Sequence, residues 1–113
     1  REGEVKNGCL ILTKEEYEEK AFQCRKDFKF VIAKNLKSVS SHLFWNCRLQ
    51  IAFMPEVEKI GDSAFSRCPI IVICFLKVKN VGNWAFNICV ELSQVFLPIC
   101  EELGWNCFYR CKN

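Results

Sequence analysis

Residues and patterns typical of enzymes and membrane proteins are scarce in this chain of 113 residues. It has a single histidine, His42, only five glycines and no glycine-rich phosphate loop, so most catalytic arrangements lack their usual groups. The longest apolar runs, residues 70–76 and 9–12, fall far short of the roughly 20 residues that cross a membrane. A positively charged start followed by an apolar stretch is also missing, so no secretory signal is visible. We expect neither an enzyme nor a protein inserted in a membrane.

The composition nevertheless supports a folded domain. Half of the residues are hydrophobic and 26% are charged, a balance that fills a core and argues against wholesale disorder. The 16 basic and 13 acidic residues leave a net charge of only +3. This excess is too small to indicate a nucleic-acid partner or binding to a membrane surface.

Nine cysteines are the most unusual part of the composition. A short chain rich in cysteine is often a secreted domain held by disulfides, but here the count is odd and the apolar content is sufficient without cross-links. Position is more informative than number, because Cys47, Cys68, Cys89 and Cys111 are separated by 21, 21 and 22 residues. Regular spacing of this length indicates a repeat protein.

Two short frames recur with this period. The first is apolar-x-x-apolar-Gly-x-x-Ala-Phe-x-x-Cys, in which Ser40 replaces one glycine while Leu43 and Cys107 replace two alanines. The second, apolar-x-x-apolar-x-apolar-Pro, precedes each copy of the first and is assigned to residues 28–34, 49–55, 71–77 and 92–98. Two frames kept in register through four successive copies predict a solenoid, in which each turn stacks on its neighbour.

The stretches EVEKIGDSAFSRC (residues 56–68) and ELSQVFLPICEELGWNCFYRC (residues 91–111) resemble the BspA-like leucine-rich repeat family. The resemblance covers residues 28–111, although Lys34 and Lys77 stand where the motif has proline. It implies a leucine-rich-repeat solenoid, a right-handed coil of short parallel β-strands joined by short helical or 3-10 turns. It also implies a cell-surface or secreted protein that adheres to host or matrix proteins. The residues alone do not distinguish that location from the cytoplasm.

We expect residues 1–27 to form an N-terminal cap and residues 28–113 to form four leucine-rich repeats of 21–22 residues. Residues 13–16 have the form of a capping box, and apolar residues follow at helical spacing. This pattern predicts a strand over residues 9–12 and an amphipathic capping helix over residues 14–24. The other end shows no such cap, so the chain is expected to be a fragment or to be covered there by another chain.

Strand alternation predicts which side chains face outward. If Val31, Ala33 and their counterparts point into the core, the outward positions stack into two columns that are almost entirely large and apolar. The predicted partner-binding residues are Phe30, Ile32, Ile51, Phe53, Ile73, Phe75 and Phe96. Contiguous exposed apolar side chains usually mark a contact surface. Two alternatives stay open, namely that another part of the polypeptide covers this face and that a one-residue slip exchanges the two faces.

Other candidate sites are weaker. The cysteine column is interpreted as buried thiols, and the cluster of Cys100, Cys107 and Cys111 lacks the paired knuckles of a zinc ribbon. His42 is the one available imidazole and falls in a variable turn, where an ordinary surface histidine is expected. We therefore predict no catalytic residue, no cofactor and no metal.

The sequence thus predicts a protein-interaction module with a protein partner and no nucleic acid. The leading role is adhesion or recognition through one face of the solenoid. The competing role is a structural or assembly domain, in which the face rich in Phe and Ile joins two copies of the chain or packs within a larger protein.

Overall fold

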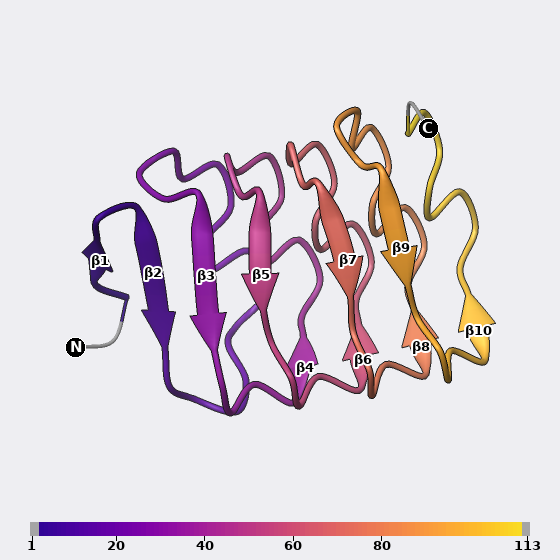
Figure 1. Cartoon of the computed structure of the whole chain (residues 1–113), viewed down its shortest axis with the longest axis horizontal. Helices are drawn as coiled ribbons and strands as arrows, with labels where there is room; N and C mark the ends of the chain where they lie inside the picture. The colour runs from indigo at the N-terminus through magenta and orange to yellow at the C-terminus, as the bar shows by residue number, and fades with distance from the viewer. Residues whose placement is uncertain (1–2, 112–113) are drawn as a thin grey trace.

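The computed structural model describes residues 3–111, which form a coil of about five turns (Figure 1). Each turn contributes one strand to a front side of the coil, and four turns contribute a second strand to a back sheet. The front strands are β2 (Cys9–Leu12), β3 (Phe30–Ala33), β5 (Ile51–Phe53), β7 (Val72–Cys74) and β9 (Gln94–Phe96). The back strands are β4 (Ser38–Val39), β6 (Lys59–Ile60), β8 (Asn80–Val81) and β10 (Glu102–Leu103). The solenoid expected from the repeats is therefore the observed fold, but within residues 3–111 plain turns join the strands in place of the expected helical or 3-10 turns.

The strands of consecutive turns pair in parallel, with equivalent residues side by side. The back sheet is continuous in the order β10-β8-β6-β4, but the front side is divided into two sheets, β1-β2-β3-β5 and β7-β9. Strands β5 and β7 stand apart in Figure 1 and are not hydrogen-bonded neighbours. The front of the coil is thus interrupted between its third and fourth strands.

The predicted capping helix over residues 14–24 is wrong, because this segment continues the coil. The backbone N–H groups of Lys20, Phe22 and Cys24 donate to carbonyls of the next turn at 3.1, 3.1 and 2.8 Å. Lys20 and Cys24 have φ angles of +65° and +63°, in the left-handed region that interrupts an α-helix. Hydrogen bonding to the neighbouring turn has overridden the local helical pattern.

A β-hairpin, and not a helix, covers the N-terminal end of the front sheet. Strand β1 (Val5–Lys6) pairs antiparallel with β2. The two residues between them are Asn7 and Gly8, with φ angles of +55° and +79°, the combination that a two-residue hairpin turn requires. The boundary expected at residue 27 falls between the first and second turns, and as a domain boundary it stays a prediction.

One phenylalanine from each turn stacks on the next along the coil. The ring centroids of Phe22, Phe44, Phe65, Phe86 and Phe108 lie 5.2–5.8 Å apart, with successive rings within 18° of parallel. Four of these rings are buried, and Phe108 in the last turn is half-buried. Stacked rings at such distances contribute about 0.5–1.5 kcal/mol per pair beyond the area that they bury. The phenylalanine column of the repeat therefore forms the centre of the core.

The thiols of the repeat column donate hydrogen bonds between turns. Cys47, Cys68, Cys89 and Cys111 each bond to the carbonyl oxygen of the phenylalanine in the preceding turn, with Sγ···O distances of 3.0, 3.0, 3.2 and 3.1 Å. Burial raises the pKa of Cys47 to about 11 and that of Cys89 to about 12, because a buried thiolate loses its solvation. Cysteine thus supplies a small apolar volume and a donor in one side chain.

The glycine column marks the closest approach between turns. A Cβ atom on Gly82 would lie 2.7 Å from the backbone N of Asp62 and 2.7 Å from the carbonyl carbon of Gly61. Such a contact is far below van der Waals separation, so any side chain here would push two turns apart. The close spacing of the turns therefore requires glycine at this position.

Candidate protein-binding face

The third repeat begins one residue earlier than the predicted frame over residues 71–77. Ile73 and Phe75 point into the core and expose 0% and 2% of their surface, whereas Cys74 and Leu76 are exposed. The predictions that place Ile73 and Phe75 on the outer face are therefore wrong. The predicted frame assumes 22 residues between the second and third repeats, while their strands are 21 apart, as Cys68 and Cys89 are.

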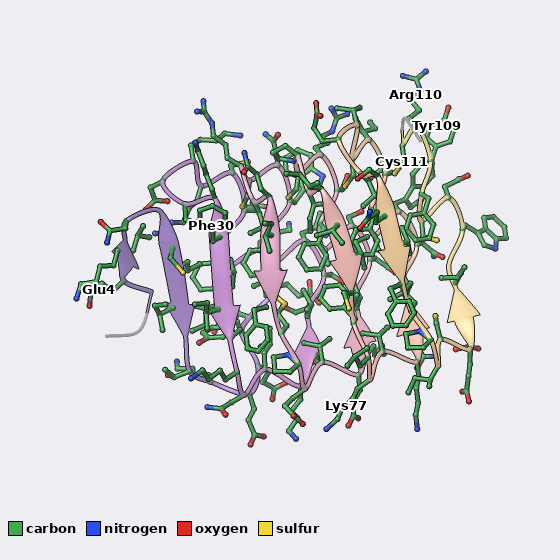
Figure 2. The ribbon with its side chains drawn as sticks, in the orientation of Figure 1. Glu4, Phe30, Lys77, Tyr109, Arg110 and Cys111 are labelled. Atoms are coloured by element: carbon green, nitrogen blue, oxygen red, sulfur yellow. The ribbon has the colours of Figure 1, made fainter. Side chains whose placement is uncertain are left out.

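The other predicted residues lie on the outward side of the front strands (Figure 2, where Phe30 is labelled on β3). Phe30, Ile51, Phe53 and Phe96 expose 38%, 43%, 53% and 55% of their surface, and Ile32 is half-buried. Within each of the two front sheets, strand pairing aligns the outward positions into two columns. With the third turn corrected, this outer face consists of Cys9, Phe30, Ile51, Val72 and Gln94 in one column and Ile11, Ile32, Phe53, Cys74 and Phe96 in the other.

The outer face is large for a surface patch. Ile71 and Leu76 adjoin it and expose 41% and 57% of their surface. Together with the exposed outward residues Phe30, Ile51, Phe53 and Phe96 they offer roughly 600 Å² of side chain, taking about 200 Å² for a fully exposed large side chain. That is at the upper limit for the largest apolar patch of a typical monomer, and patches of this size are often functional.

A groove opens on the outer face where the front sheet is interrupted. It has a volume of about 260 Å³ and is lined by Ile51, Ala52, Phe53, Met54, Pro55, Val72, Cys74 and Leu76. At one end Ile71 N–H donates to the Gln50 carbonyl at 3.0 Å, and beyond the other end Lys79 N–H donates to the Glu58 carbonyl at 2.9 Å. The turns are therefore joined on both sides of the groove, which is a bounded hollow and not a channel.

Unpaired basic side chains flank strands β3 and β5 of this face. Lys29, Lys34 and Arg48 are exposed, and no ion pair involves them within residues 3–111. Glu56, by contrast, bonds to Lys77 at 2.8 Å, and this bond lowers the pKa of its carboxyl group. The local charge beside β3 and β5 is therefore positive.

The back sheet presents a different surface. Its outward side chains are Ser38, Lys59, Asn80 and Glu102, which carry no dominant charge. The tryptophans lie in the turns, where Trp84 packs edge-on against Tyr109 at 5.8 Å and Trp105 is 80% exposed. This sheet has the character of a solvated surface.

The candidate chemical groups are dispersed. Within the part of the chain that the structure describes, no three His, Cys, Asp or Glu side chains lie where they could hold one metal ion. All nine cysteines are free thiols, of which Cys24 and Cys74 are exposed. His42 is half-buried in a turn with a φ angle of +58°. Among the described residues no helix is long and apolar enough to cross a membrane.

Stacked parallel turns with an inward ladder of apolar residues define a parallel β-solenoid built from repeats. The model of the BspA type leucine rich repeat region matches residues 15–113 in six copies. This chain belongs to that family.

Solved structures show the same architecture. A leucine-rich repeat protein from Bacteroides ovatus is 28% identical, with a TM-score of 0.70 over 75% of this chain and 23% of its own. The pneumococcal vaccine antigen PcpA is 16% identical, with a TM-score of 0.70 over 87% of this chain and 33% of its own, and this likeness concerns the fold alone. This chain thus spans a third or less of either protein. None of the curated proteins compared matches it.

Proposed function

We propose that this chain is a non-enzymatic protein-interaction module that recognises a protein partner through its outer face, at the cell surface or after secretion. The observation that supports this most directly is the run of outward apolar residues across all five front strands. A solvated sheet has no physical reason to expose them, since each costs free energy in contact with water. Membership of a family of repeat proteins agrees with a binding role.

The same observation favours a second candidate, a domain that assembles with a copy of itself. Large apolar patches occur at the interfaces of homodimers as well as at binding sites for other proteins. Roughly 600 Å² of exposed apolar side chain approaches the 800 Å² per partner of a standard interface. Adhesion to host or matrix proteins and self-assembly would therefore use the same outer face. They differ only in whether another protein or a second copy of the chain binds to it.

One pair of double variants tests both candidates. Phe30→Asp with Phe96→Asp charges the outer face, and Glu58→Ser with Lys59→Ser alters exposed residues near or on the back sheet as the matched control. Light scattering across a dilution series measures self-association, and binding to a panel of immobilised extracellular-matrix proteins measures adhesion. Loss of either signal in the outer-face variant, but not in the control, supports the proposal. A monomer that binds nothing, or binding that both variants retain, contradicts it.

A further inference from the structure

The groove between β5 and β7 differs from the remainder of the outer face because it is concave. The side chains that line it are all apolar, with Ile51 and Phe53 on one strand and Val72 and Cys74 on the other. At about 260 Å³ it has room for one large side chain, given that a water molecule occupies about 30 Å³ in the liquid. Pockets of this kind at the centre of an interface hold the anchor residue that contributes most of the binding energy.

The closed ends of the groove restrict what can enter it. The Ile71–Gln50 and Lys79–Glu58 backbone bonds join the two turns on either side, so a whole strand cannot be inserted between β5 and β7. A side chain can enter from outside, carried by a segment that lies across the sheet. An extended segment suits this approach, because alternate side chains point to the same side.

The charges beside the groove indicate what surrounds the anchor. Lys34 follows β3 directly, at the position equivalent to Pro55 in the groove wall, and Lys29 precedes β3. These two lysines lie at the two ends of β3, Arg48 lies in the segment that leads into β5, and none of the three has an ion pair among the described residues. Acidic residues of a bound segment that lie over β3 would meet complementary charge, which promotes association and fixes orientation.

We propose that the groove between β5 and β7 receives one large aliphatic or aromatic side chain of an extended partner segment whose acidic residues lie over β3. This inference rests on the proposed function of the outer face and specifies its partner class. It also distinguishes that partner from a second copy, because two outer faces placed against each other would oppose their own exposed lysines.

Two exposed cysteines make the test possible with native groups. Cys74 lies in the groove, whereas Cys24 lies in the turns of the N-terminal segment. Random 12-residue peptides displayed on phage are selected on the immobilised full chain, and the enriched sequences are synthesised. We expect a recurring Leu, Ile, Met or Phe with neighbouring Asp or Glu. Such peptides should slow alkylation of Cys74 at least tenfold and leave Cys24 unchanged.

Substitutions then locate the bound peptide. Cys74→Trp fills the groove from an exposed position, and we expect it to weaken peptide binding at least tenfold. Leu76→Glu, also at an exposed position, should do the same if the first variant proves unstable. Phe96→Ser lies on the same face outside the groove and should change affinity less than threefold. Lys34→Glu should weaken acidic peptides several-fold at low salt, with the difference lost at high salt.

The outcomes separate this inference from the function on which it rests. If the peptides still bind to the Cys74→Trp variant but not to the variant with Phe30→Asp and Phe96→Asp, the groove is not the binding site. The proposed function of the outer face would then still hold. Enriched peptides without acidic residues, or an absence of enrichment, would also overturn the inference. A change in molecular mass on Cys74→Trp would identify a second copy as the occupant. Binding that none of these variants alters would contradict both proposals.

Discussion

The corrected register of the third turn predicts opposite roles for two phenylalanines. Phe75 is 2% exposed and its ring lies 6.2 Å from that of Phe65, whereas Phe53 is 53% exposed on the outer face. The frame predicted from the motif assigns both to the surface. Phe53→Ala and Phe75→Ala are therefore a matched pair, in which the same atoms are removed from two strands of the front side.

The expected free energies of unfolding differ widely. Phe75→Ala removes a fully buried ring and leaves a cavity beside the phenylalanine stack, so it should cost about 3–5 kcal/mol. Phe53→Ala removes a ring that is only half covered and leaves no enclosed cavity, so it should cost about 1 kcal/mol. Natural domains have only about 5–15 kcal/mol of stability, and the first substitution therefore brings the protein close to unfolding.

Urea unfolding followed by tryptophan fluorescence measures the difference. With a slope near 1.5 kcal/mol per molar urea, the midpoint should fall by roughly 2–3 M for Phe75→Ala and by less than 1 M for Phe53→Ala. Near-ultraviolet circular dichroism in buffer checks that each variant starts from the native fold. Equal shifts, or a larger loss for Phe53→Ala, would refute the assigned register and with it the outer face.

Three further predictions concern the stacking of turns. Cys68→Val removes the donor to the Phe44 carbonyl and should cost about 1–2 kcal/mol, while Cys24→Ser at an exposed site should change the urea midpoint very little. Buried thiols bind their protons more tightly in the folded state than in the unfolded state. Their contribution to stability should therefore be constant below their ordinary pKa of 9.0, decline above it and be lost as the pH rises through 11–12, the folded pKa values of Cys47 and Cys89. A urea midpoint that is unchanged between pH 8 and pH 11 would contradict this. Ile88 has a φ angle of +58°, which disfavours a β-branched residue by about 1–2 kcal/mol, so Ile88→Gly should raise Tm in calorimetry by several degrees and Ile88→Ala should not.

The columns of the core could be predicted because every turn must fill the same space. Phe65, Cys68 and their equivalents occupy a cross-section that repeats along the coil, and this constraint appears in the sequence as a period. The face of the third strand could not be read in the same way. Residues 70–76 are all apolar, so no alternation distinguishes inward from outward positions, and only the spacing of the cysteines indicates the register.

Neither the structure of the N-terminal segment nor the groove could be predicted from local sequence patterns, and the reasons differ. Residues 13–24 carry a capping pattern, but hydrogen bonds from Lys20, Phe22 and Cys24 to the next turn replace those of a helix. These partners lie about 20 residues further along the chain, so a local sequence pattern cannot predict them. The interruption between β5 and β7 depends on the path of two backbones. Residue types at the lining positions predict an apolar surface but not that the surface is hollow.

The thiol column has a consequence for the conditions in which this architecture can exist. Each repeat thiol is engaged with a main-chain oxygen, and none of the nine cysteines is joined to another sulfur. Assembly of the coil therefore needs no oxidant, and a reductant has no cross-link to break. Hydrogen bonds and packing between turns, and not covalent links, hold the thiol column in place.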